Sequence, residues 1–175
     1  LPRRGRENTA QQAGIVPEVF LGLGSNVLPE ANLRLAKTEL DRRFRLVAVS
    51  AVYRNAAVGF EGNDFLNAVA CIETDASPGN VCLQLEEIHD LAGRSRGEHS
   101  FVSRSLDIDL LLYGNVIDDA HKVPRDDILE YAFVLRPLAE LAPDLTHPVT
   151  GRTMADHWQA FDHGSHHLEP VDGIL

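Results

Sequence analysis

Two aspartates inside an otherwise apolar run, SLDIDLLLYG at 105–114, constrain how this chain can fold more than its other features do. Successive side chains of a β-strand point to opposite faces, so a strand here places Asp107 and Asp109 on one face together with Leu111. The opposite face then carries Leu106, Ile108, Leu110 and Leu112. Since burying a carboxylate without a partner is costly, we expect a strand whose apolar face packs on helices and whose other face carries a polar site.

The remaining apolar patterns predict a β-α-β-β-α-β order of elements. Alternating and β-branched runs predict strands, and apolar residues at helical spacing after Pro29 or Pro78 predict helices. The strands are expected over 18–24, 44–55, 64–74 and 105–114, and the helices over 29–43 and 77–93, with two more over 134–141 and 153–160 after a loop at 115–132. This order is typical of an α+β, ferredoxin-like βαββαβ fold with helices on one face of the sheet and extra C-terminal helices. We expect the other face to be open or covered by loops.

Length and composition indicate one globular domain with polar ends. The chain has 175 residues, of which 44% are hydrophobic and 24% are charged, as in ordinary soluble proteins. We expect a flexible tail at 1–16, a folded domain at 17–161 and a mobile, polar tail at 162–175. The alternative for the last segment is that its histidines bind a metal ion.

The net charge and the cysteine content argue against several classes of partner. A formal net charge of −10 disfavours a broad electrostatic grip on nucleic acid or on an anionic membrane. No apolar run approaches the ~20 residues of a membrane span. Cys71 and Cys82 lie in apolar stretches, so they indicate no disulfide framework and suit a reducing cytosol. We therefore expect a cytoplasmic protein that binds neither nucleic acid nor membrane.

The paired carboxylates suggest a metal site. Two like charges this close repel each other unless a cation lies between them. Mg²⁺ commonly takes one or two carboxylates and completes its shell with water and phosphate oxygens. The alternative is that Asp107 and Asp109 are solvated charges on an exposed sheet face, and the motif alone does not decide between the two.

Neighbouring residues add features of a ligand site. Phe65 and Asn67 share one strand face, so they offer a flat apolar surface beside a paired donor and acceptor, which suits a planar heteroaromatic ligand. Arg94, Arg96 and Arg104 precede the aspartates, and guanidinium groups match phosphate oxygens in geometry. The alternative stays open that Asn67 is a structural amide beside Phe65 in the core and that the arginines are surface charges.

Six motifs together resemble one enzyme family. They are LGLGSN (21–26), SAVYRN (50–55), DFLNAV (64–69), GRSR (93–96), SRSLDIDLLLYG (103–114) and AFVLRPLAELAPDL (132–145). In this order, across 19–161, the chain is similar to the 6-hydroxymethyl-7,8-dihydropterin pyrophosphokinases of folate biosynthesis. No single motif is specific, but their combination is.

The resemblance implies a ferredoxin-like pyrophosphokinase domain at 17–161 that transfers pyrophosphate from ATP to the hydroxymethyl group of the pterin and releases AMP. It implies two Mg²⁺ ions held by Asp107 and Asp109, an aromatic sandwich of the pterin by Phe65 and Phe133, and a hydrogen bond from Asn67 to the pterin edge. The further pterin contacts that it implies are Asn55, Val58 and Phe101, and the phosphate contacts, on mobile lids, are Arg94, Arg96 and Arg104. We expect the enzyme to work as a monomer.

Four positions differ from the family pattern. Phe101 stands at the usual tryptophan of a lid, and His89 stands where a glutamate contacts the nucleotide. Arg125 replaces a histidine that contacts ATP, and Tyr131 replaces an arginine. One alternative is therefore a pterin-binding paralogue with lost or altered nucleotide chemistry. A metal-dependent enzyme that acts on nucleic acid is a second alternative, against which the negative charge counts.

Overall fold

One antiparallel sheet of six strands organises the protein in this computed structural model, which describes residues 14–57, 61–94, 105–164 and 166–175. The strands are β1 (Glu18–Ser25), β2 (Arg45–Val49), β3 (Val52–Asn55), β4 (Phe65–Glu73), β5 (Leu106–Tyr113) and β6 (Glu169–Val171). The helices are α1 (Pro29–Arg43), α2 (Pro78–Arg94), α3 (Asp127–Glu130), α4 (Ala132–Leu141) and α5 (Met154–Ala160).

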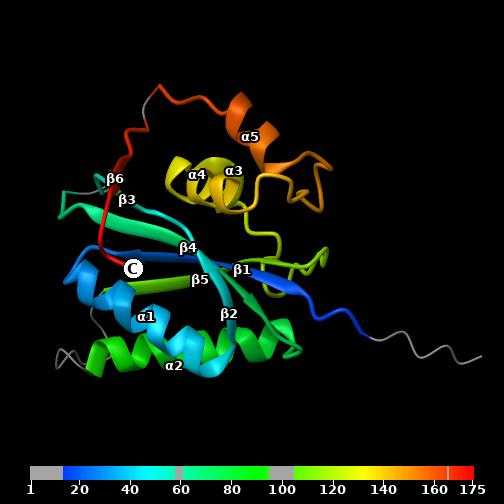
Figure 1. Cartoon of the computed structure of the whole chain (residues 1–175), viewed down its shortest axis with the longest axis horizontal. Coiled ribbons are helices and arrows are strands. Elements are labelled where there is room, and N and C mark those ends of the chain that lie inside the picture. Colours follow the sequence, from blue (N-terminus) through cyan, green and yellow to red (C-terminus); the bar gives the residue numbers. More distant parts are fainter. Residues whose placement is uncertain (1–13, 58–60, 95–104, 165) are drawn as a thin grey trace, which may run out of the picture.

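The order of the strands is that of a ferredoxin-like sheet. The sheet runs β5-β1-β4-β3-β6, and β2 also pairs with β4. β1 lies in the interior of the sheet and pairs antiparallel with both β4 and β5. α1 and α2 lie together on one face (Figure 1), where Leu33, Leu40 and Ile88 pack on apolar residues of the strands. The predicted fold class is confirmed.

The second face of the sheet is covered by helices, and the expectation that loops or solvent cover it was wrong. Val134, Leu135 and Leu138 of α4 form a second apolar core with Phe20 of β1 and Val69 of β4. In Figure 1, α3 and α4 lie on the side of the sheet opposite α1 and α2. α3 falls inside 115–132, which the sequence predicted to be a loop. In the described ranges, no helix combines the length and the apolar character that a membrane crossing needs.

A β-bulge in β5 changes the face on which Leu112 lies. Leu110 and Leu112 pair with consecutive residues of β1, so Leu111 is an extra residue in β5. Because a bulge interrupts the alternation of side chains, Leu111 and Leu112 both join the second core. The predicted face of Leu112 was therefore wrong, whereas Asp107 and Asp109 precede the bulge and keep the predicted alternation.

The single strand expected over 44–55 is two strands, β2 and β3. Ser50 lies between them, where its N–H donates to the carbonyl of Val69 at 2.8 Å. The hydroxyl of Ser50 accepts a hydrogen bond from the N–H of Val69, also at 2.8 Å. These two bonds continue the pairing with β4 between the two strands, both of which run antiparallel to it.

The C-terminal segment is part of the sheet, and the expectation of a mobile tail was wrong for its last residues. β6 pairs antiparallel with β3, and Val171 lies opposite Val52. Ile174 is only 7% exposed, and its carbonyl accepts a hydrogen bond from Arg34 on α1 at 3.1 Å. β3 otherwise presents an open edge of backbone groups, which a short apolar segment can satisfy.

Candidate active site

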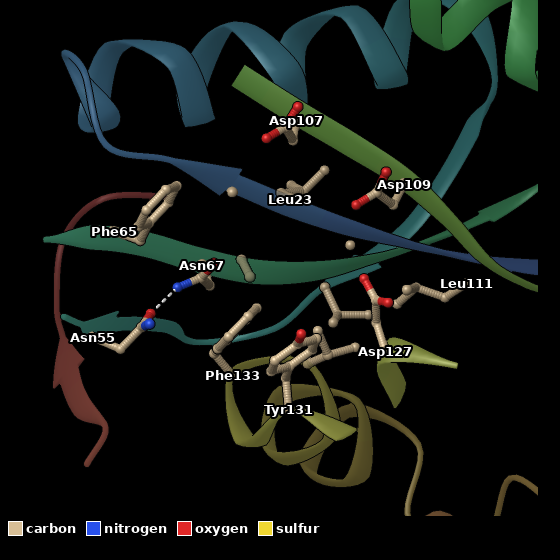
Figure 2. A pocket seen from close by; sticks show the side chains of 15 residues that line it. Leu23, Asn55, Phe65, Asn67, Asp107, Asp109, Leu111, Asp127, Tyr131 and Phe133 are labelled. Atoms are coloured by element: carbon tan, nitrogen blue, oxygen red, sulfur yellow. Dashed lines mark hydrogen bonds between the residues drawn. The ribbon is translucent and has the colours of Figure 1, made fainter. Parts of the chain in front are cut away.

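A cavity of about 300 Å³ lies between the sheet and the start of α4 (Figure 2). Four strands and two helices contribute its walls. The lining residues are Gly22, Leu23, Gly24, Asn55, Phe65, Asn67, Ala68, Val69, Asp107, Asp109, Leu111, Asp127, Tyr131, Phe133 and Val134. Six residues that the sequence suggested for pterin and metal binding therefore meet in one place, namely Asn55, Phe65, Asn67, Asp107, Asp109 and Phe133.

Asn67 lies buried in the floor of the cavity. It is 5% exposed, and its side-chain nitrogen donates a hydrogen bond to the side-chain oxygen of Asn55 on β3. Phe65 lies two residues earlier on β4, and Phe133 comes from α4 on the other side of Asn67 in Figure 2. The ring of Phe133 stacks on that of Tyr131, with centroids 5.0 Å apart. This end of the cavity combines flat aromatic surfaces with an amide.

Two glycines of β1 keep the cavity open between its two ends. Gly24 lies opposite Asp107 in the sheet, and Gly22 lies opposite Asp109. A Cβ atom on Gly24 would lie 3.1 Å from the side-chain oxygen of Asn67. The residue pattern did not reveal this role, because only the pairing with β4 and β5 places these glycines against the site.

Three carboxylates lie at the other end of the cavity. Asp107 and Asp109 come from β5, and Asp127 of α3 points towards Asp109 in Figure 2. Arg125 connects two of them, since its Nε lies 3.1 Å from Oδ2 of Asp127 and its Nη2 lies 3.6 Å from Oδ1 of Asp109. Burial lowers the pKa of the Arg125 guanidinium, but the negative charges of Asp109, Asp127 and Asp107 together raise it by more. The pKa therefore lies above its usual value.

The donor set at this end fits a hard cation that brings ligands of its own. No group of three or more side chains suited to hold a metal by themselves occurs among the described residues. Two carboxylates on one strand face are nevertheless what Mg²⁺ takes from a protein when phosphates and water complete its shell. The residues that could hold such an ion are Asp107 and Asp109, as the sequence suggested.

Two of the positions that depart from the family pattern have defined roles. His89 does not line the cavity. Its Nε2 accepts a hydrogen bond from the backbone N–H of Ile108 at 2.8 Å. It thereby ties α2 to β5 at the outer edge of the sheet. Tyr131 does line the cavity, beside Phe133.

Several predicted residues cannot be placed against the cavity. Val58, Arg96, Phe101 and Arg104 lie outside the described residues, and Arg94 is the last residue of α2. The expected lids are therefore untested.

The C-terminal segment borders the site, although the sequence predicted only a mobile, polar tail there. A second hollow of about 340 Å³ shares Asn55 and Phe133 with the cavity, and His166 and His167 form part of its wall. The segment before β6 reaches this position because β6 pairs with β3, the strand that carries Asn55.

Comparison with known proteins assigns the chain to a family. The sequence model of 7,8-dihydro-6-hydroxymethylpterin-pyrophosphokinase (HPPK) matches residues 20–143. The 2-amino-4-hydroxy-6-hydroxymethyldihydropteridine pyrophosphokinase of Pseudomonas aeruginosa is 36% identical over 140 residues, which cover 77% of this chain and 86% of that protein. The enzyme of the same name from Methylorubrum extorquens is 38% identical over 146 residues, covering 78% of this chain and 89% of that protein.

Solved structures agree on the fold. Wild-type HPPK-DHPS of Plasmodium falciparum, crystallised with pterin and p-hydroxybenzoate, matches with a TM-score of 0.65 at 13% identity, covering 85% of this chain. This chain spans 43% of that longer protein. The chain belongs to the 7,8-dihydro-6-hydroxymethylpterin-pyrophosphokinase family and is a pyrophosphokinase, a transferase of folate biosynthesis.

Proposed function

We propose that the cavity binds 6-hydroxymethyl-7,8-dihydropterin at Asn67 and accepts the pyrophosphate of ATP at Asp107 and Asp109. The observation that carries this proposal is that one cavity joins a buried amide between aromatic rings to a cluster of carboxylates. Both cysteines are free thiols, which suits a reducing compartment such as the cytoplasm.

The pterin end would recognise a flat ring with amide-like edges. Phe65 and Phe133 would hold the ring between them, since aromatic faces stack on planar ligands. Asn67 would pair with the polar edge of the pterin, and its bond to Asn55 would hold the amide in place. A pterin in this position directs its hydroxymethyl group along the cavity towards the carboxylates.

The carboxylate end would hold two Mg²⁺ ions through Asp107 and Asp109. When bound, Mg²⁺ neutralises phosphate charge and orients the phosphates for in-line displacement. Arg94 at the end of α2, with Arg96 and Arg104 between it and β5 in the sequence, would contact the phosphates. These roles match the chemistry of guanidinium and carboxylate groups.

The reaction moves a pyrophosphoryl group between two oxygens. The hydroxymethyl oxygen forms a bond to the β-phosphorus of ATP, the bond from that phosphorus to the oxygen of the α-phosphate breaks, and AMP leaves. The hydroxyl proton passes to solvent. Rate acceleration would come mainly from holding the two substrates in line and from charge stabilisation.

Incubation with 6-hydroxymethyl-7,8-dihydropterin and Mg-ATP tests the proposal. We expect AMP and pterin diphosphate in equal amounts, and no AMP when the pterin is left out. ADP as the product would mean single phosphoryl transfer and would refute the proposed chemistry. Pterin binding with no nucleotide product would instead identify a binding protein.

A further inference from the structure

Arg125 is anchored beside the carboxylate end of the cavity by its own backbone. Its N–H donates to the carbonyl of Leu111 at 2.9 Å, which fixes the residue next to β5 two positions beyond Asp109. Its side chain is 29% exposed, so it lies against the protein and does not extend into solvent. Arg125 is therefore held where its guanidinium reaches two carboxylates that line the cavity.

The guanidinium links the two walls of this end of the cavity. Asp109 belongs to β5 and Asp127 belongs to α3, and Arg125 contacts both at the distances given above. The contact with Asp127 is the firmer of the two, because Nε donates a hydrogen bond across this distance of 3.1 Å. A guanidinium stays charged at every pH at which proteins are folded. Arg125 thus places a permanent positive charge within reach of Asp109.

We infer that Arg125 is a positioning residue that neutralises Asp109 while no Mg²⁺ is bound and gives up this contact when the metal arrives. The inference rests on the proposed function, because it takes Asp109 as a metal ligand. Two cations on one carboxylate repel each other. The arginine can release Asp109 without leaving the site, since its bond to Asp127 and its backbone anchor do not involve Asp109.

Removing the charge of Arg125 should lower the stability of the metal-free protein and raise its affinity for the metal. The metal-free protein loses an ion pair that joins β5 to α3, so it should become less stable. The metal no longer competes with a guanidinium for Asp109, so it should bind more tightly. A purely structural arginine would give the first effect and not the second.

Titration of the full chain with Mn²⁺, followed by the electron paramagnetic resonance of the free ion without nucleotide, measures the second effect. We expect Arg125→Gln to tighten Mn²⁺ binding about threefold, the size of a partly exposed charge interaction. Arg125→Lys, which keeps the charge, should bind Mn²⁺ as the wild type does. In chelator, Arg125→Gln should lower Tm by about 2 °C. Arg45→Gln is the matched control, because Arg45 pairs with Glu73 at the far end of β4.

The same titration separates this inference from the proposed metal site. Asp109→Asn should weaken Mn²⁺ binding strongly. If Asp109→Asn binds Mn²⁺ as the wild type does, or if the wild type binds none, the metal role of Asp109 is wrong and the inference is overturned with it. If Asp109→Asn loses Mn²⁺ but Arg125→Gln binds it with unchanged or weaker affinity, the proposed site stands and the inference alone is overturned.

Discussion

The side-chain nitrogen of Asn67 on β4 donates a hydrogen bond to the side-chain oxygen of Asn55 on β3. This bond joins neighbouring strands in the floor of the cavity and fixes which way the buried amide of Asn67 points. A fixed amide is what a site needs to recognise the edge of a planar heteroaromatic ligand. The relationship therefore gives the first test of the pterin site.

We expect Asn67→Ala to weaken pterin binding by about 1–3 kcal/mol, since a polar edge of the ligand is then buried without a partner. Isothermal titration with 6-hydroxymethyl-7,8-dihydropterin measures the loss. Asn80→Ala, at an exposed position on α2, is the control. Unchanged affinity in Asn67→Ala would make Asn67 a structural amide only.

A substitution of Gly24 on β1 tests whether the position of the Asn67 amide matters for pterin binding. A Cβ at this position would approach Oδ1 of Asn67 to 3.1 Å, and the buried amide has little room to move away. Gly24→Ala should therefore fold but lose about 0.5–1.5 kcal/mol of pterin affinity as the hydrogen bond is displaced. Gly14→Ala is the control, because a Cβ atom at this position outside the cavity would have nothing within 4 Å. Equal affinities in the two variants would contradict the prediction.

The raised pKa of Tyr53 predicts that the folded protein loses stability at alkaline pH. Burial and the carboxylate of Glu140, which accepts the hydrogen bond of its hydroxyl, raise the pKa of Tyr53 to about 12 from a usual value of 10.0. The folded state therefore holds this proton more tightly than the unfolded state does, and the stability that results is complete below pH 10 and is lost as the pH rises towards 12.

Thermal melts between neutral pH and pH 11 check this prediction. The Tm of the wild type should fall more steeply with pH than that of Tyr53→Phe. Cys71, whose pKa burial also raises to about 12, is present in both proteins, so the difference in slope isolates Tyr53. Parallel slopes would show that Tyr53 does not hold its proton through the fold.

Ile174 tests whether the C-terminal segment belongs to the folded domain. Its side chain is 7% exposed within the core beneath α1, so Ile174→Ala should destabilise the protein by about 2–4 kcal/mol. Ile117→Ala, at a position that is 60% exposed, should have little effect. Urea unfolding of both variants gives the comparison, and equal midpoints would indicate that the segment does not pack on the core.

The sequence predicted those parts of the site that depend on local pattern. The alternation within β5 and β4 placed Asp107 with Asp109 and Phe65 with Asn67, because side-chain direction in a strand follows from residue spacing alone. Asp127 was missed, and Tyr131 was noted only as a departure from the family pattern, because both lie in a stretch that reads as a loop. Their position depends on the packing of α4 on the sheet, which involves residues far apart in the sequence.

The errors in the predicted fold also come from contacts between residues far apart in the sequence. The bulge at Leu111 arises from pairing with β1, and no residue type in β5 signals it. The C-terminal segment from residue 162 has only Leu168, Val171, Ile174 and Leu175 as aliphatic residues, too few to predict a strand. It becomes ordered because β3 offers it an open edge, and that edge exists only in the folded sheet.

The most direct test of the proposed site is to measure pterin binding and AMP formation together in Asp109→Asn. Because Asp109 lies at the carboxylate end of the cavity and Asn67 at the pterin end, we expect unchanged pterin affinity with AMP formation reduced about 100-fold or more. Asp41→Asn, on the exposed side of α1, should match the wild type in both measurements. Wild-type AMP formation by Asp109→Asn in Mg²⁺ would contradict the division of the cavity into a pterin end and a metal–phosphate end.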